Sequence, residues 1–396
     1  MKKPFLSDVS IIFSGQLIAG GAAFIYTVIT ARLLGIEDYG LFQSLFALYG
    51  ICSLFSNPLY LSVVHGVGVS PPEFRAEATG QFIKVASIFA GMIAVGLIII
   101  SPKLIGVLHM NSLLPIWIVA ILLITRAWLT TIYGSIQGQN QHGLFSVSKI
   151  AEALICLIIG TMFLVLGGRT VGAIFGYFWG MVLPIFYFVF IKRIFIIRKG
   201  FDRIKVEFGN IAKILIAFGV LTMIDNLPIL IGRSKLSPEE SGLFGALFNL
   251  RNILFPFAFA VAVPFYTHSL NGNQQPSIFK KALLLVSGLG VGFVCAGILF
   301  PKFLISTIYG RTFVEASQYM AIYGVSLWLE MILIVLIFYR LAQKKINSWI
   351  LPLPIFIFIP CLFFSHLNIG QLMISQIVAS IIYVLIFSAN SLFDRS

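Results

Sequence analysis

Charged residues are scarce in this chain. Only 10% of its 396 residues are Asp, Glu, Lys or Arg, and 59% are hydrophobic, whereas a soluble globular protein carries about 25% charged residues. Long apolar runs alternate with short polar turns, and lipid leaves a backbone no hydrogen-bond partners except within helices or closed barrels. The alternating pattern of barrel strands is absent, so the sequence predicts an all-α integral membrane protein.

Residues that carry enzyme or metal chemistry are also few. The four cysteines stand singly in apolar runs, and the five histidines show no ligand spacing. The sequence has no Walker loop, no HExxH, no GxSxG in the right context and no DxD pair on a loop. We therefore expect no catalytic residue, no metal site and no cofactor. The first apolar stretch is of spanning length, so we expect a retained helix and not a cleaved secretory signal.

Hydropathy in windows of about 19 residues predicts twelve spanning helices, six in each half of the chain. In the first half they cover residues 8–31, 40–65, 81–106, 113–136, 144–166 and 170–191. In the second half they cover 210–232, 242–267, 279–304, 314–339, 347–366 and 370–390. The predicted domains are an N-terminal six-helix bundle (1–191), a basic cytoplasmic linker (192–209) and a C-terminal six-helix bundle (210–396).

The formal net charge of +13 has a topological explanation. If the N-terminus is cytoplasmic, most Lys and Arg residues fall on the cytoplasmic side, as the positive-inside rule requires. Both termini are then cytoplasmic, and no nucleic-acid partner is needed to explain the charge. The basic stretch KRIFIIRKGFDRIK (192–205) is an orientation determinant, or it lies along anionic headgroups.

One stretch of the chain occurs twice. Leu34–Leu48 (LGIEDYGLFQSLFAL) returns at residues 236–250 (LSPEESGLFGALFNL), an offset of 202. Because six spans bring the chain back to the same side, the halves are predicted to be parallel repeats about an axis along the membrane normal, with a cavity between two bundles. The acidic pairs at positions 37–38 and 239–240 suit helix N-termini, so we interpret them as caps.

Ionisable residues deep in the predicted spans are the candidates for function. A charge at mid-bilayer costs at least about 2.5 to 3.5 kcal/mol, so it is retained mainly when it is paired or faces water. Arg126, Asp225, Arg251 and Glu330 lie deepest. Arg126 and Glu330 are 204 positions apart, close to the repeat offset, so we expect them to face each other or a common cavity.

The functional interpretation assigns opposite tasks to the two signs of charge. Arg126 and Arg251, helped by Lys149, form a cationic lumen for an anionic substrate group, because arginine stays charged and can bind an anion through a bidentate fork. Asp225 or Glu330 then takes up a proton or another coupling cation. These five residues are the predicted substrate-binding and ion-coupling positions.

A structural interpretation competes for the same residues. Arg126 and Glu330 would form an ion pair that locks the bundles, and Lys149 would pair with Glu152 three residues further along one helix face. Asp225 is followed closely by Pro228, so we also expect a bend in that helix. Three glycines at intervals of four, Gly172, Gly176 and Gly180, predict a face for close helix packing.

Residues 31–42 (ARLLGIEDYGLF), after a first helix containing Gly15, Gly20 and Gly21, resemble the signature of Wzx-type polysaccharide (O-antigen) flippases. These belong to the multidrug/oligosaccharidyl-lipid/polysaccharide exporter superfamily. The resemblance implies a MATE-like fold of two six-helix bundles that rock around a central cavity. It also implies transfer of polyprenyl-pyrophosphate-linked oligosaccharide from the inner to the outer leaflet of a bacterial inner membrane, for cell-surface polysaccharide biosynthesis.

We therefore expect a transporter and not an enzyme. Its partners would be lipid-linked oligosaccharide, membrane lipids, and the polysaccharide polymerase and glycosyltransferases of the same pathway. A cation-coupled multidrug exporter of the same superfamily is one alternative, although its lumen should favour acids over arginines. A membrane-embedded polymerase or ligase acting on lipid-linked glycans is the other, although the predicted outer loops are too short to house its site.

Overall fold

The computed structural model describes residues 5–194, 208–270, 276–343, 350, 353–363 and 367–393. Every regular element in these ranges is a helix, which confirms the predicted all-α class. Most of the predicted linker (192–209) falls outside the described residues.

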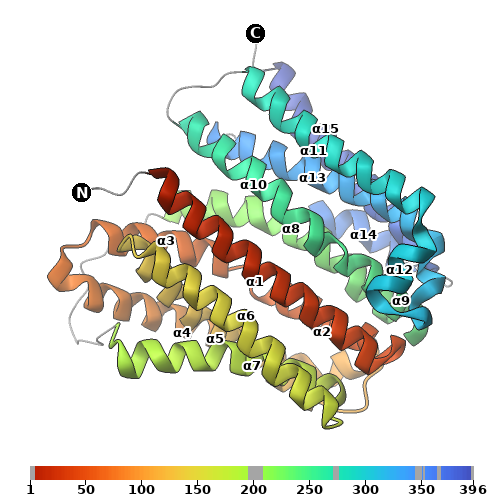
Figure 1. The fold of residues 1–396 in the computed structure, drawn as a ribbon, viewed down its shortest axis with the longest axis horizontal. Helices are drawn as coiled ribbons and strands as arrows, with labels where there is room; N and C mark the ends of the chain where they lie inside the picture. The colour runs from red at the N-terminus through yellow and green to blue at the C-terminus, as the bar shows by residue number, and fades with distance from the viewer. Residues whose placement is uncertain are drawn as a thin grey trace. The chain divides into compact units, whose positions relative to one another are not determined.

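In the first half of the chain, a glycine with a positive φ marks two of the breaks between helices. Gly35 (φ +76°) separates α1 from α2, and Gly167 (φ +84°) precedes α7. Glycine occupies this left-handed region without a steric penalty, so it suits these turns. The elements are α1 (Phe5–Leu34), α2 (Ile36–Cys52), α3 (Ser56–Val69), η1 (Pro72–Phe74), α4 (Arg75–Val107), α5 (Leu114–Gly138), α6 (His142–Val165), α7 (Arg169–Phe186) and the π-helical η2 (Tyr187–Ile191) (Figure 1).

The second half repeats the alternation of long helices with short turns. Proline is the first residue of three of its helices, where the missing backbone donor is not needed. The elements are α8 (Phe208–Lys235), α9 (Pro238–Asn249), α10 (Arg251–Leu270), α11 (Pro276–Leu299), α12 (Pro301–Tyr309), η3 (Arg311–Tyr319), α13 (Met320–Ala342), α14 (Leu353–Phe363) and α15 (Ile369–Phe393).

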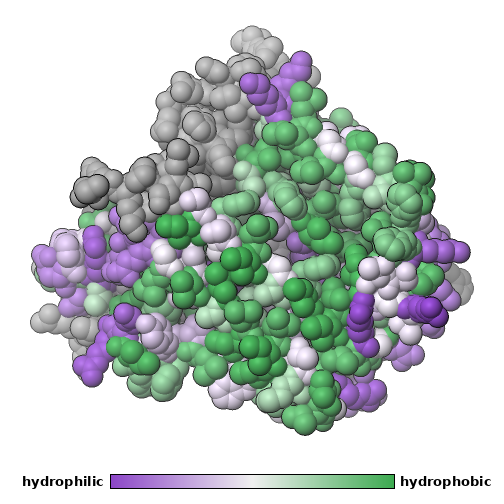
Figure 2. All heavy atoms as spheres, viewed as in Figure 1, coloured by the Kyte–Doolittle hydropathy of each residue, from purple (hydrophilic) through white to green (hydrophobic). Residues whose placement is uncertain are grey.

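Many of these helices meet the length and hydropathy of a membrane span, so the chain is a multi-pass membrane protein. Among the described residues nine do so, and α2 with α3, bent by 46° at their junction, make a tenth. The predicted number of twelve is not confirmed, since the spans at 210–232 and 347–366 include residues that are not fully described. Figure 2 shows apolar side chains over most of the visible face, with hydrophilic ones gathered toward helix ends.

The chain divides into two compact units. Unit 1 comprises Met1–Leu33 and Tyr49–Leu215, and unit 2 comprises Leu34–Leu48 and Ile216–Ser396. The first copy of the repeated stretch therefore packs with the second half of the chain. The domain boundaries drawn from the sequence remain a prediction.

Glycines bring α6 and α7 together inside unit 1. A Cβ on Gly176 would lie 2.5 Å from the Cα of Gly160, and one on Gly180 would lie 2.9 Å from the carbonyl oxygen of Glu152. The hydroxyl of Tyr26, on α1, donates to the Ala173 carbonyl on α7 at 2.6 Å. The predicted packing role of the α7 glycines is thus confirmed, and these contacts hold the helix that carries Glu152.

The two copies of the repeated stretch pack against each other inside unit 2. A Cβ on Gly40, in α2, would lie 2.7 Å from the backbone nitrogen of Gly242, in α9. A Cβ on Gly242 would overlap the carbonyl oxygen of Ile36. We call this contact the repeat seam: two helix backbones that touch directly, at a distance that only glycine allows.

The start of α9 confirms part of the predicted capping. The Ser237 hydroxyl accepts from the Glu240 backbone N–H at 3.2 Å, and the Glu240 carboxylate accepts from the Ser237 backbone N–H at 3.1 Å. This reciprocal arrangement is a capping box. Glu37 and Asp38 likewise lie in the first turn of α2, where negative charge suits the helix dipole.

Candidate functional site

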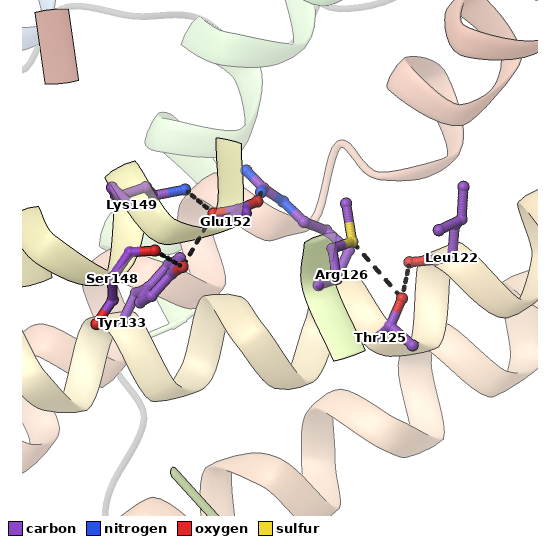
Figure 3. Close-up of polar contacts among 8 residues, drawn as sticks. Leu122, Thr125, Arg126, Tyr133, Ser148, Lys149 and Glu152 are labelled. Atoms are coloured by element: carbon purple, nitrogen blue, oxygen red, sulfur yellow. Dashed lines mark hydrogen bonds and ion pairs between the residues drawn. The ribbon is translucent and has the colours of Figure 1, made fainter. Parts of the chain in front are cut away.

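The first cluster of buried charges lies in unit 1, between α5 and α6. The Glu152 carboxylate accepts from the Lys149 ammonium at 3.0 Å and from the Tyr133 hydroxyl at 2.9 Å, both on Oε2. Its other oxygen, Oε1, is 3.7 Å from the Arg126 guanidinium. Figure 3 shows the three side chains converging on Glu152 from the two helices. We call these four residues the unit 1 cluster.

Helix periodicity explains why these side chains meet. Arg126 and Tyr133 are seven positions apart on α5, which is two turns, so they lie on one face of that helix. Lys149 and Glu152 are one turn apart on α6. On the preceding turn of α5, the Thr125 hydroxyl donates to the Leu122 carbonyl at 3.0 Å and lies 3.6 Å from the Met181 sulfur of α7.

The unit 1 cluster has an excess of positive charge. Two cations share a single carboxylate, which leaves a formal net charge of +1. Arg126 has the most exposed side chain of the three, at 32% against 23% for Lys149 and 16% for Glu152. At 3.7 Å its contact with Glu152 is longer than a hydrogen bond, so the planar donors of the guanidinium are not committed to that carboxylate.

The second cluster lies in unit 2 and involves α8, α10, α13 and α15. The Arg251 guanidinium is 2.8 Å from the Asp225 carboxylate and stands 4.1 Å from the centroid of the Phe248 ring. Glu330, only 1% exposed, accepts from the Gln376 amide at 2.6 Å and from the Ser326 hydroxyl at 3.3 Å. We call Asp225, Arg251, Glu330 and Gln376 the unit 2 cluster.

The unit 2 cluster has the opposite balance of charge. Two carboxylates face one guanidinium, so its formal net charge with both acids ionised is −1. Asp225 and Arg251 both lie within electrostatic reach of Glu330. Among the described residues no group of three or more His, Cys, Asp or Glu could hold a metal ion.

The structure decides some of the pairings that the sequence left open. The predicted pair of Lys149 with Glu152 is confirmed. Within their own units, Arg126 contacts Glu152 and Glu330 accepts from Gln376. The predicted ion pair between Arg126 and Glu330 stays a prediction.

Two further expectations concern residues near Asp225. Arg251, predicted to bind a substrate anion, lies 2.8 Å from the Asp225 carboxylate, and its role in substrate binding stays a prediction. α8 continues as a helix through Asp225 and Pro228 to Lys235, and the predicted bend at this proline stays a prediction. A proline removes only one backbone donor, and nearby polar groups remain satisfied locally, as in the Asn226 amide, which donates to the Thr222 carbonyl at 2.8 Å.

Sequence reasoning missed two members of these clusters. Tyr133 shares a face of α5 with Arg126, and its two-turn spacing was the available signal. Gln376 is the more instructive omission, because an amide in the middle of an apolar span needs a buried partner. Attention to charged residues alone passed over it.

Solved structures share this fold over nearly the whole chain. An inward-facing multidrug resistance MATE family transporter of the MOP superfamily is 13% identical, with 95% of this chain and 96% of that one covered and a TM-score of 0.72. A MOP superfamily transporter from Pyrococcus furiosus is 13% identical, with 97% and 95% covered and a TM-score of 0.66. A eukaryotic MATE transporter is 12% identical, with 98% and 95% covered and a TM-score of 0.67. The predicted MATE-like fold is confirmed.

The amino-acid sequence shows the family to which this chain belongs. The family described as polysaccharide biosynthesis protein matches residues 5–234, more than half of the chain. The chain therefore belongs to the polysaccharide biosynthesis protein family. No curated protein matches it.

Proposed function

We propose that this protein is a flippase that carries polyprenyl-pyrophosphate-linked oligosaccharide from the cytoplasmic to the outer leaflet during polysaccharide biosynthesis. Membership of the polysaccharide biosynthesis protein family and the fold of known transporters support this proposal. The observation that carries it is the unit 1 cluster, where two cations on two apolar helices of spanning length share one carboxylate. An excess positive charge in that position is suited to an anionic group that arrives with a substrate.

Each member of the unit 1 cluster has a task in binding a pyrophosphate. Arg126 has the longest contact with Glu152 and the most exposed side chain, so its fork is the first group that phosphate oxygens would meet. Lys149 supplies a second positive charge. Glu152 holds both cations in place when the substrate is absent, which lowers the cost of keeping them within the membrane.

We assign coupling to the unit 2 cluster. Its formal excess of negative charge at Asp225 and Glu330 suits a proton or another monovalent cation. Arg251 is already paired with Asp225 at 2.8 Å. Its role in this proposal is to balance the charge of Asp225, and Arg126 is the first residue to contact the substrate. Loading and release of the cation would accompany the alternation of access in a two-bundle transporter.

A cation-coupled multidrug exporter is the second candidate, because one of the similar structures is a multidrug resistance MATE transporter. The two candidates differ in the charge of the cargo. A cationic drug would be repelled by the unit 1 cluster, whereas a pyrophosphate would be attracted.

The remaining assignments follow from this role. We place the protein in a bacterial inner membrane with both termini cytoplasmic, as the distribution of Lys and Arg supports. Its expected partners are the polysaccharide polymerase and glycosyltransferases that extend and supply the glycan. The chemistry is movement of an intact substrate, so we propose no enzymatic activity.

Deletion of the gene tests the substrate. Lipid-linked oligosaccharide should accumulate in the inner leaflet, and surface polysaccharide should fall. Restoring the gene should reverse both changes. Unchanged surface glycan with no accumulated intermediate would refute the flippase assignment.

Arg126→Gln and Arg251→Gln, expressed in the deletion strain, test the site. Arg126→Gln should abolish export at normal protein levels, because it removes the leading phosphate contact. Arg311→Gln makes the same chemical change at an exposed position at the start of η3 and should leave export intact. Full export by both cluster variants would assign these arginines to structure alone.

A further inference from the structure

The hydrogen bonds around Glu330 are unevenly distributed. Both donors, the Gln376 amide and the Ser326 hydroxyl, reach the same carboxylate oxygen, Oε1. The other oxygen, Oε2, accepts no hydrogen bond from the described residues, and neither does the amide oxygen of Gln376. Gln376 is completely buried and Glu330 almost so. A buried acid thus lies beside a buried amide, and each has an acceptor oxygen without a donor.

The other charged and titratable groups near Glu330 are engaged elsewhere. Arg251, on α10, is within 2.8 Å of Asp225, on α8. The Tyr323 hydroxyl, on α13, donates to the Phe248 carbonyl at 2.9 Å. Gln376, from α15, is therefore the group that makes the shortest hydrogen bond to Glu330, at 2.6 Å.

A primary amide has a property that matters in this position. It presents donors on its nitrogen and an acceptor on its oxygen, and a half-turn about its terminal bond exchanges the two. An ionised carboxylate needs a donor opposite it, whereas a protonated carboxyl needs an acceptor for its own O–H. The amide can satisfy either form from the same place in the helix core.

We propose that Gln376 is a positioning residue that allows Glu330 to change its protonation state within the membrane, by reversing the direction of their hydrogen bond. In the ionised state the Gln376 N–H donates to Glu330, in the arrangement that the structure has at 2.6 Å. When water supplies a proton, an O–H bond forms on the carboxylate and the turned amide accepts from it. When the proton returns to water, that O–H bond breaks and the amide turns back.

The energetic reason is that neither state leaves the carboxyl without a partner. An unsatisfied buried polar group costs about 1 to 3 kcal/mol, and more when it is charged. An apolar residue at position 376 would remove the main partner of the ionised form and leave Ser326 as the remaining donor. This inference rests on the proposed coupling role of Glu330, but the proton change itself can be measured without any substrate.

Infrared difference spectroscopy of the purified full-length protein in lipid tests the proposal directly. The wild type should lose the C=O band of a protonated carboxyl as the pH is raised, and this change should be absent in Glu330→Gln, which assigns the band. Gln376→Met keeps the length of the side chain and removes its amide. It should lose the pH-dependent change, with the protonated band present throughout. A normal Glu330 titration in Gln376→Met would overturn the proposal.

A second measurement on the wild-type protein covers the case in which Gln376→Met does not fold. With isotope-labelled glutamine side chains, the amide C=O band should move in step with the Glu330 carboxyl band, and this coupled movement should vanish in Glu330→Gln. An amide band that stays still while Glu330 titrates would refute the reversal. Ser380→Ala, also buried on α15, controls for packing and should titrate like the wild type.

Transport measurements separate this proposal from the proposed function. If the spectroscopic changes occur but the protein moves no lipid-linked oligosaccharide, the amide reversal stands and the substrate assignment fails. If transport occurs in the wild type and the amide does not respond to Glu330, the flippase stands and the reversal fails.

Discussion

The buried clusters of the two units differ in the sign of their charge, although the two copies of the repeated stretch resemble each other. The repeated stretch supplies a matching glycine to each helix of the seam, Gly40 in α2 and Gly242 in α9. The buried clusters have no such likeness. The unit 1 cluster has two cations for one carboxylate, whereas the unit 2 cluster has two carboxylates for one cation.

This difference arises at related positions in the chain. Arg126 and Glu330 are 204 positions apart, close to the repeat offset of 202, and Tyr49 and Arg251 are separated by the offset itself. Helix packing depends on size and shape, so the glycines of the seam are restrained by their neighbours. A buried charge is stabilised by its particular partners. A residue of opposite charge can therefore occupy a related position when its partners differ too. The two copies of the repeated stretch thus share their packing glycines, whereas the two buried clusters differ in the sign of their charge.

The largest expected effect comes from reversing the sign of the unit 1 cluster. Arg126→Glu changes its formal net charge from +1 to −1, and an anionic substrate then meets repulsion where it met attraction. We expect transport to fall at least about 100-fold, because like-charge juxtaposition costs several kcal/mol.

Flipping by purified protein in vesicles, at equal amounts of inserted protein, measures this loss. Arg126→Lys, which retains the charge but not the fork, should lose less. Equal activity of the Glu and Lys variants would mean that the charge of this cluster has no part in transport.

The second expected effect concerns stability. Glu152→Gln leaves Arg126 and Lys149 without a carboxylate, and removal of one member of a buried ion pair costs about 3 to 5 kcal/mol. Asp225→Asn should cost less, because Glu330 is a second acid within reach of Arg251. The free energy of unfolding in mixed detergent micelles measures both, and a larger loss for Asp225→Asn would contradict the charge balance described for the two units.

The third effect tests the packing of the two copies of the repeated stretch at the repeat seam. Gly242→Ala places a methyl group against the Ile36 carbonyl oxygen, so α2 and α9 must separate. Overpacking of this kind costs about 1 to 3 kcal/mol of unfolding free energy. Gly20→Ala, where a Cβ meets nothing within 4 Å, is the matched control and should be neutral or slightly stabilising. If both variants unfold alike, the seam is not a tight contact.

The smallest effect is expected at the start of α9. Ser237→Ala removes the hydroxyl that accepts from the Glu240 N–H, and loss of such a cap costs about 1 kcal/mol. Ser237→Asp should keep most of that stability. The same unfolding assay measures it, and an unchanged midpoint in Ser237→Ala would show that the capping box contributes nothing measurable.

The sequence predicted structure correctly where the prediction depends on residues that are close together in the chain. Hydropathy predicted a multi-pass helical membrane protein, the spacing of Lys149 and Glu152 predicted their ion pair, and intervals of four placed Gly172, Gly176 and Gly180 on a packing face. It failed where partners are far apart in the chain. Asp225 and Arg251 are 26 positions apart on different helices, and Glu330 and Gln376 are 46 apart.

The amino-acid sequence by itself determined the all-α membrane class, the repeat and the residues that carry charge into the spans, because hydropathy and helix periodicity follow from composition and order alone. Only the tertiary structure decided how those charges are shared. In the folded protein Glu152 pairs with Arg126 and Lys149, Asp225 pairs with Arg251, and Gln376 donates a hydrogen bond to Glu330. The physical reason is that a buried charge takes its partner from whichever helices pack around it, and that packing depends on the shapes of all the helices together.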